Sequence, residues 1–168
     1  MKKALIVIDM QNDFVSGSLA NEQAQAIVSP IAAYVNDFDG DVIATRDTHG
    51  ENYLSTAEGR YLPVVHCVHG TLGWQIADEI HGALIHRNAI ILDKPTFGYL
   101  GWELSAYDEI ELVGTCTDIC VVSNALIIKA KFPNLTVKVH ASLCAGTSIE
   151  NHNAALKTMA CCQVQILP

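Results

Sequence analysis

Basic residues are scarce in this 168-residue chain, and charged residues of any kind make up only 17% of it. Lys and Arg number 10 against 18 Asp and Glu, so the formal net charge is −8. Because nucleic-acid binding needs basic side chains to neutralise phosphates, we expect no nucleic-acid partner. No apolar run approaches the ~18 residues of a membrane span, so no membrane association is expected. Half of the residues are hydrophobic, which excludes extensive disorder and predicts one domain over residues 1–168.

The N-terminus is not expected to act as a secretory signal. Lys2 and Lys3 precede the apolar run Ala4–Ile8, but this run is short and ends in Asp9 without a small-residue cleavage site. The six cysteines lack the paired spacing of a structural zinc site, and a core of this size does not need disulfides. We therefore predict a cytoplasmic protein in which five of the six cysteines are packing residues.

Apolar strands alternate with helices along the chain, which predicts a single α/β domain with a mostly parallel sheet. No glycine-rich phosphate loop follows the first strand, so a Rossmann-type nucleotide module is not supported. The predicted strands are Lys3–Ile8, Asp41–Arg46, Ala89–Leu92, a segment containing Ile110, Leu112 and Val113, Leu135–His140, and Gln163–Leu167. The predicted helices are Asn21/Glu22–Asn36, Gln75–His81, Ile119–Ala130 and Ser148–Ala160, and Ser142–Thr147 is predicted to be a loop.

The fourth strand leads into the segment that carries the most chemical information. Asp118 is a good N-cap residue for the following helix, which places Cys120 in the first helical turn. Unpaired backbone N–H groups and the helix dipole stabilise a thiolate there, and the same groups can bind an oxyanion. The alternative interpretation is a buried cysteine that acts as a small hydrophobe.

Asp9, Asp47 and Lys94 follow or end other predicted strands. In an open parallel sheet the carboxyl ends of the strands meet at one edge, and ligands bind at that edge. Asp9 and Lys94 alone are also compatible with an ordinary buried ion pair. Their combination with Cys120 favours a catalytic site.

These residues lie within segments that resemble the isochorismatase-like cysteine hydrolases, and within them the nicotinamidase/pyrazinamidase branch. The resemblance covers almost the whole chain, in order. It is carried by Ala4–Phe14 (ALIVIDMQNDF), Asp47–His49 (DTH), Pro63–Gly73 (PVVHCVHGTLG), Asp93–Lys94, Val113–Val121 (VGTCTDICV) and Cys144–His152 (CAGTSIENH). It implies a three-layer domain in which a six-stranded sheet has helices on both faces.

The resemblance also implies a catalytic set. Cys120 corresponds to the nucleophile, Asp9 to the general base, and Lys94 to the residue that tunes both. A non-proline cis peptide is expected between Thr115 and Cys116, and the N–H groups of Cys116 and Cys120 would form the oxyanion hole. An ammonium group and a helix N-terminus beside a cysteine are expected to lower its pKa.

A divalent metal site is a second implication. The resemblance assigns Asp47, His49, Glu58 and His66 as ligands, with Glu58 at the position that varies between His and Glu in this branch. Such a mixed set of nitrogen and oxygen ligands suits Zn, with Fe or Mn as alternatives. Family members without metal exist, so the alternative is that Asp47 and His49 organise the loop while Glu58 is solvated. His69 is interpreted as a surface residue or as one that lies behind the ligands.

The substrate pocket differs from that of the branch. Many nicotinamidases have an aromatic residue directly before the Pro-x-x-His segment, where Leu62 stands here, with Tyr61 one residue earlier. Trp74 is displaced from that position and is predicted to pack. Phe14 and Phe97 are the candidate pocket walls, and the alternative for both is a role as plain core aromatics.

We therefore expect a cysteine-dependent amidohydrolase that converts a small carboxamide, nicotinamide first, to a carboxylate and ammonia through a thioester. A hydrolase of another small amide, ureide or carbamoyl compound is the alternative, and a silent α/β binding or scaffold domain is a further one. Isochorismate is disfavoured because relatives that cleave it need no thiol. The resemblance also implies a homo-oligomer.

Overall fold

Six parallel strands form one sheet, and the two halves of the chain extend it in opposite directions. The computed structural model describes residues 1–168, and the strand order is β3-β2-β1-β4-β5-β6. The order reverses between β1 and β4, a position where a crevice forms at the carboxyl ends of the strands. The strands are β1 (Lys3–Ile8), β2 (Asp41–Asp47), β3 (Ile90–Lys94), β4 (Glu109–Thr115), β5 (Thr136–Ala145) and β6 (Gln165–Leu167). The predicted mostly parallel sheet is confirmed, because every strand pair is parallel.

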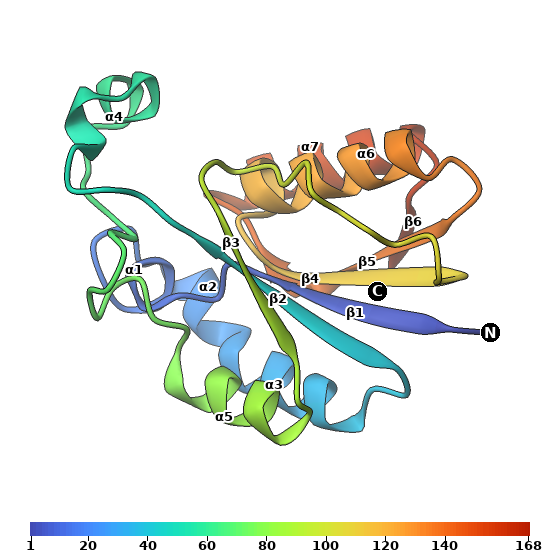
Figure 1. The fold of residues 1–168 in the computed structure, drawn as a ribbon. Coiled ribbons are helices and arrows are strands. Elements are labelled where there is room, and N and C mark those ends of the chain that lie inside the picture. The colour runs from blue at the N-terminus through green and yellow to red at the C-terminus, as the bar shows by residue number, and fades with distance from the viewer.

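Helices cover both faces of this sheet and complete the three predicted layers (Figure 1). On one face lie α2 (Glu22–Ala26), α3 (Val28–Asp37) and α5 (Asp78–His86), and on the other α6 (Val122–Lys131) and α7 (Ile149–Cys161). Alternate residues of β1 divide between the two cores, since Leu5 and Val7 pack with α3 and α5 whereas Ile6 and Ile8 pack with α6. No helix combines the length and the hydropathy required to cross a membrane.

The predicted single helix Asn21/Glu22–Asn36 is in fact two helices, α2 and α3, which meet at Ile27. The Asn21 side chain caps α2 by accepting a hydrogen bond from the Ala24 N–H. Pro30 lies in the first turn of α3, where the missing N–H removes no helical hydrogen bond. The proline therefore marks the start of a new helix.

The start of the helix after β4 was also predicted wrongly. A π-helical turn, η2 (Thr117–Val121), precedes α6, and Asp118 does not cap it. The Asp118 carboxylate instead accepts hydrogen bonds from the Thr147 N–H (2.8 Å) and the Thr147 hydroxyl (2.5 Å). Asp118 thus ties the turn to the loop after β5.

Other boundaries shift by a few residues. The helix predicted at Gln75–His81 runs over α5, and the loop predicted at Ser142–Thr147 begins only where β5 ends. Ser148 caps α7 as predicted, through a hydrogen bond from the Asn151 N–H.

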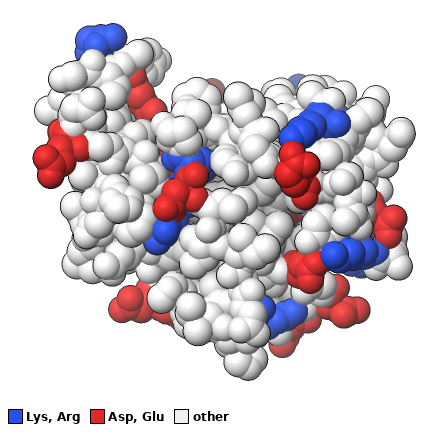
Figure 2. All heavy atoms as spheres, in the orientation of Figure 1, with Lys and Arg blue, Asp and Glu red and all other residues white.

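The segment between β2 and α5 leaves the sheet as a projecting arm. It contains the short helices η1 (Tyr53–Ser55) and α4 (Ala57–Tyr61), and α4 stands clear of the body in Figure 1. Figure 2 shows the arm rising above the rest of this face, with side chains of both charges on it. A bridge between His49 and Val68 joins the two ends of the arm at the body, beside α1 (Asn12–Val15).

Candidate active site and metal centre

Asp9, Lys94 and Cys120 come from three different strand ends and meet at the carboxyl edge of the sheet. Asp9 follows β1, Lys94 ends β3, and Cys120 lies in η2 after β4. Lys94 Nζ is 2.6 Å from Asp9 Oδ2 and 3.8 Å from Cys120 Sγ. Asp9 and Lys94 are 0% exposed and Cys120 is 5% exposed. One amine therefore contacts both a carboxyl group and a thiol at a buried position.

Neighbouring groups fix the orientation of this cluster. The Thr45 hydroxyl donates a 2.7 Å hydrogen bond to Asp9 Oδ1, which leaves Oδ2 directed at Lys94. Lys94 Nζ also donates to the Thr96 carbonyl at 3.2 Å. Thr45 therefore contributes to the site, and the sequence interpretation missed it. A polar residue two positions before the end of a buried strand could have indicated this role.

Burial and neighbouring charges shift the pKa values of all three groups in this cluster. Burial raises the pKa of Asp9, and the Lys94 ammonium opposes that rise. Burial would lower the pKa of Lys94, but Asp9 and Cys120 outweigh it and raise the pKa above its ordinary value. Burial and then Asp9 raise the pKa of Cys120, with only Lys94 acting to lower it. Asp9 and Lys94 are thus paired at 2.6 Å, beside a thiol whose pKa is raised by burial and by the Asp9 charge.

This result corrects the expectation that the Cys120 pKa would be lowered. That expectation considered the ammonium group and the helix start, both of which favour a thiolate. It did not include the nearly complete burial of Cys120 or the carboxyl group of Asp9 next to it, which both favour the thiol. A thiol with a raised pKa would need a base to accept its proton before it could act as a nucleophile.

The backbone before Cys120 has an unusual course. The peptide bond between Thr115 and Cys116 is cis, as predicted. Gly114 has a φ of +121°, and a Cβ there would collide with the backbone of Ile8 in β1, so only glycine allows this close approach. The N–H of Cys116 donates no backbone hydrogen bond within the protein.

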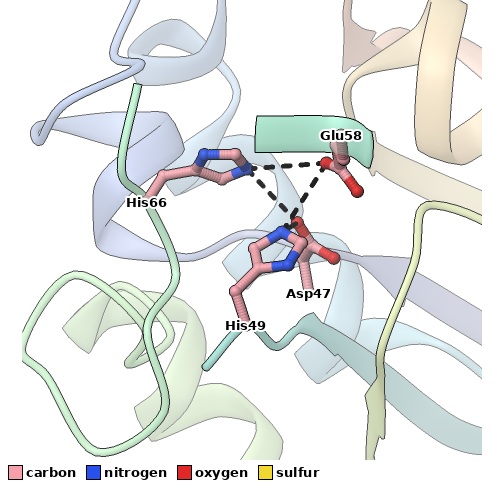
Figure 3. Close-up of side chains that lie close together, drawn as sticks. All are labelled: Asp47, His49, Glu58 and His66. Carbon is pink, nitrogen blue, oxygen red and sulfur yellow. Dashed lines mark hydrogen bonds and ion pairs between the residues drawn. The ribbon is translucent and has the colours of Figure 1, made fainter. Parts of the chain in front are cut away.

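A second cluster lies beside the first and contains two carboxylates and two imidazoles. Asp47 ends β2, and Glu58 comes from α4 in the arm. Figure 3 shows the four side chains pointing toward a common centre. His49 Nε2 lies 2.9 Å from Asp47 Oδ2 and 3.6 Å from Glu58 Oε1, and His66 Nε2 lies 3.5 Å and 4.0 Å from the same atoms. The four candidate ligand atoms are all within 4.8 Å of one another.

The chemistry of this cluster fits a metal ion. The Nδ1 of His66 is 2.7 Å from the Val64 carbonyl. In the neutral imidazole, a hydrogen bond donated there leaves Nε2, which faces the cluster, as the nitrogen that can bind a metal. Asp47 Oδ1 is buried and has no hydrogen-bond partner, with Lys94 Nζ 3.6 Å away. Two imidazole nitrogens and two carboxylates suit Zn, Fe or Mn better than Mg or Ca.

Two residues that support this cluster were missed by the sequence interpretation. The Gln11 side chain forms two hydrogen bonds with the backbone of Asp47. Its Nε2 donates to the Asp47 carbonyl (2.8 Å), and its Oε1 accepts from the Asp47 N–H (2.7 Å). Gln11 lies within Ala4–Phe14, one of the segments that resemble the family, and this position could have indicated a role in the site. Tyr53 is fully buried against both imidazoles, with ring centroids 4.7 Å from His49 and 4.9 Å from His66, and no sequence pattern pointed to it.

The candidate aromatic residues occupy different environments. Phe14 is buried with its ring centroid 5.7 Å from that of His66, whereas Phe97 is 45% exposed. Trp74 lies under the Arg46 guanidinium, 3.7 Å from Cζ to the ring centroid, and donates to the Thr48 hydroxyl at 2.9 Å, so its predicted packing role is confirmed. Tyr61 is 94% exposed on the arm.

The chain is similar to known proteins over almost its whole length. The isochorismatase domain matches residues 3–167. The nicotinamidase/pyrazinamidase of Mycobacterium tuberculosis is 29% identical over 184 residues, which cover 98% of both chains. The crystal structure of the Bacillus subtilis nicotinamidase/pyrazinamidase PncA superposes with a TM-score of 0.85 at 28% identity and covers 100% of both chains. That of the Pyrococcus horikoshii pyrazinamidase in complex with zinc gives 0.81 at 25% identity, with 99% of both chains covered. The chain therefore belongs to the isochorismatase family.

Proposed function

We propose that this protein is a cysteine-dependent amidohydrolase that converts nicotinamide to nicotinate and ammonia. The observation that carries the proposal is the contact of Lys94 with both Asp9 and Cys120 in a buried site. The nicotinamidase activity named for the similar proteins of M. tuberculosis and B. subtilis supports the choice of substrate. Pyrazinamide, the analogue named for the same relatives, is the second substrate to test.

In the first half of the reaction, Cys120 Sγ attacks the carboxamide carbon while Asp9 accepts the thiol proton. The carbonyl oxygen gains the negative charge, and the N–H groups of Cys116 and Cys120 stabilise it. Lys94 keeps Asp9 ionised until the proton arrives. Collapse of this intermediate breaks the carbon–nitrogen bond, and Asp9 passes the proton to the departing nitrogen, so ammonia leaves and a thioester remains.

In the second half, Asp9 removes a proton from a water molecule that attacks the thioester carbon. The carbon–sulfur bond then breaks and Cys120 regains its proton from Asp9. The product carboxylic acid loses its remaining proton to solvent and leaves as the carboxylate. The same carboxyl group thus acts in both halves. Its complete burial and its ion pair with Lys94 account for a base that can exchange one proton repeatedly.

Asp47, His49, Glu58 and His66 would hold a divalent metal, with Zn as the first choice and Fe or Mn as alternatives. When bound, the metal supplies a Lewis-acid contact for the ring nitrogen of the substrate. Phe14, which lies against His66, and Phe97 would contact the ring faces. These contacts position the carboxamide beside Cys120, and the thiol performs the bond cleavage.

A substrate panel with coupled ammonia detection tests the proposal. Nicotinamide and pyrazinamide are compared with a ureide, an N-carbamoyl amino acid and an aliphatic amide, and nicotinate is identified by chromatography. Turnover of nicotinamide with capture of a thioester on the Cys120 peptide is the expected result. Turnover of only the ureide or carbamoyl compound would reassign the substrate, and no turnover of any compound would favour a binding domain.

Three further features of the protein remain predictions. We expect residues 1–168 to unfold as one cooperative domain, which calorimetry tests. We expect a homo-oligomer, which light scattering tests, and a cytoplasmic location, which cell fractionation tests.

A further inference from the structure

The side chain of Asn124 connects two parts of the site that are distant in sequence. Asn124 is fully buried near the start of α6. Its Nδ2 donates hydrogen bonds to the carbonyl oxygens of Cys120 (2.8 Å) and Phe97 (2.9 Å). Its Oδ1 accepts hydrogen bonds from the Tyr99 N–H (2.9 Å) and from the Trp102 indole N–H (3.0 Å). One amide therefore links the turn that carries the nucleophile to the segment that follows Lys94.

The segment held in this way, residues 95–102, touches the reactive cluster as well as α6. At its beginning, the Thr96 carbonyl accepts a hydrogen bond from Lys94 Nζ. In its middle, Gly98 approaches Ile127 of α6 so closely that a Cβ would lie 2.6 Å from the end of the isoleucine side chain. At its end, Trp102 is buried in the core under α6. The hydrogen bonds of Asn124 to Phe97, Tyr99 and Trp102 hold this segment against α6.

The hydrogen bonds of Asn124 distinguish it from an ordinary packing residue. The side chain of Asn124 donates a hydrogen bond to the carbonyl four residues earlier, the group that accepts the backbone bond in a regular α-helix. Because this competition weakens a helix slightly, helix stability does not explain an asparagine at this position. A buried amide without partners would be unfavourable, whereas this one satisfies both of its donors and uses its acceptor twice. An apolar residue could fill the same space but could not hold Phe97 at a fixed separation from Cys120.

We propose that Asn124 is a positioning residue that locks residues 95–102 against the Cys120 turn and so fixes the separation between Phe97 and the reactive sulfur. The inference rests on the proposed amidase function. Loss of the two donor bonds releases the carbonyl of Phe97 from that of Cys120. The ring of the substrate is then held less firmly, and its carboxamide carbon lies at a less favourable position relative to the sulfur.

The test uses Asn124→Asp and Asn124→Ala with Trp102→Phe as the matched control. Asn124→Asp keeps the acceptor but replaces the donor group with an oxygen that repels both carbonyls. Asn124→Ala removes the whole amide. If Asn124→Asp does not fold, the same measurements are made on Asn124→Ala. Trp102→Phe removes one donor to the acceptor atom and leaves both bonds to Phe97 and Cys120 intact. All are made in a Cys161→Ser/Cys162→Ser background, because these two cysteines are exposed and would react with thiol reagents.

Kinetics on nicotinamide form the first readout. We expect KM to rise at least ~5-fold and kcat/KM to fall at least ~10-fold in the Asn124 variants, because small displacements at a reacting centre have large effects. Trp102→Phe should keep both values near those of the parent even where its melting temperature falls. KM is independent of the fraction of active enzyme, so destabilisation alone does not raise it. Unchanged KM and kcat/KM in folded Asn124 variants would overturn the proposal.

The second readout does not require turnover. Iodoacetamide labelling of the Cys120 peptide is followed by mass spectrometry, together with hydrogen exchange of residues 95–102. We expect labelling to be at least ~5-fold faster and exchange to be faster in the Asn124 variants, because the nearly buried sulfur and the segment both open. Unchanged labelling and exchange would overturn the inference. If the parent enzyme hydrolyses no amide but the labelling result holds, the proposed function fails while the positioning role of Asn124 stands.

Discussion

Lys94 Nζ and Asp9 Oδ2 are 2.6 Å apart, and neither side chain is exposed to solvent. Such a pair contributes little net stability compared with apolar residues of the same size, because burial removes the hydration of both charges. The pair is nevertheless anchored by the Thr45 hydroxyl and the Thr96 carbonyl. A buried ion pair placed in contact with a thiol is better explained by proton transfer than by stability.

Removal of the ammonium group tests this interpretation. Lys94→Met leaves the Asp9 carboxylate buried without a partner, and we expect the free energy of unfolding in urea to fall by roughly 3–5 kcal/mol. The double variant Asp9→Asn/Lys94→Met removes both charges and should recover most of that loss while remaining inactive. An active double variant would contradict the assigned roles, and equal stability of the single and double variants would show that Asp9 is not ionised.

Replacement of the nucleophile should separate catalysis from folding. Cys120→Ser exchanges one sulfur atom for oxygen, so the fold should remain, but kcat should fall at least ~10³-fold because a hydroxyl is a much weaker nucleophile at neutral pH. Ammonia release measures kcat, and circular dichroism checks the fold. Cys161→Ser, at an exposed cysteine, is the control and should have the parent rate. Ammonia release by Cys120→Ser at the parent rate would exclude the thiol mechanism.

Much of the fold could be predicted because the strands at the switch point are unusually apolar. Lys3–Ile8 is almost entirely buried on both faces, which is why a continuous apolar run correctly indicated a central parallel strand. The same logic placed Asp9 and Lys94 at one edge of the sheet. The π-helical turn before α6 could not be predicted, because it depends on contacts between segments distant in sequence, such as that of Asp118 with Thr147. The split at Ile27 did have a local signal in Pro30, which lies in the first turn of α3.

The candidate metal cluster shows a second limit of prediction from sequence, because one of its residues comes from a distant part of the chain. The spacing of Asp47 and His49 places them on one side of an extended segment, but Glu58 reaches the cluster only because the arm folds back through η1 and α4. Its inclusion therefore rested on resemblance and not on local pattern. The same is true of the thiol pKa, since the burial that raises it depends on residues from several elements.

Metal removal should affect substrate binding more than chemistry. We expect dialysis against a chelator to raise KM for nicotinamide and re-addition of Zn to restore it, with Fe and Mn compared in parallel. His66→Ala removes one candidate ligand and should lower the metal content measured by elemental analysis. The same variant should raise KM at least ~10-fold.

His69→Ala is the matched control for the metal cluster. His69 is exposed, stacks on Trp74 and is not part of the group of four, so its loss should change neither metal content nor KM. An unchanged KM in both histidine variants would exclude substrate anchoring by a metal, even if the thiol mechanism holds.

Glu109 provides a prediction for the pH dependence of stability, away from the reactive cluster. Its carboxylate lies at the start of β4, 3.2 Å from Lys3 Nζ and 2.7 Å from Lys138 Nζ. Burial acts to raise the pKa of Glu109, but the hydrogen bonds and charges of the two lysines outweigh it and lower the pKa below its ordinary value of 4.5. Because the folded pKa is the lower one, this group stabilises the protein above pH 4.5, and that stabilisation is lost as the pH falls through the folded pKa.

Glu109→Gln should therefore be less stable than the parent at pH 7, and the difference in the free energy of unfolding should shrink as the pH falls below 4.5. Urea unfolding between pH 3 and pH 7 measures this, at roughly half-unit steps chosen to resolve a single titration. Glu103→Gln is the control, because the Glu103 side chain is 84% exposed and its contact with Lys131 is screened by water. A stability difference for Glu109→Gln that stays constant over this range would mean that packing, and not the charge of Glu109, sustains the contacts between β1, β4 and β5.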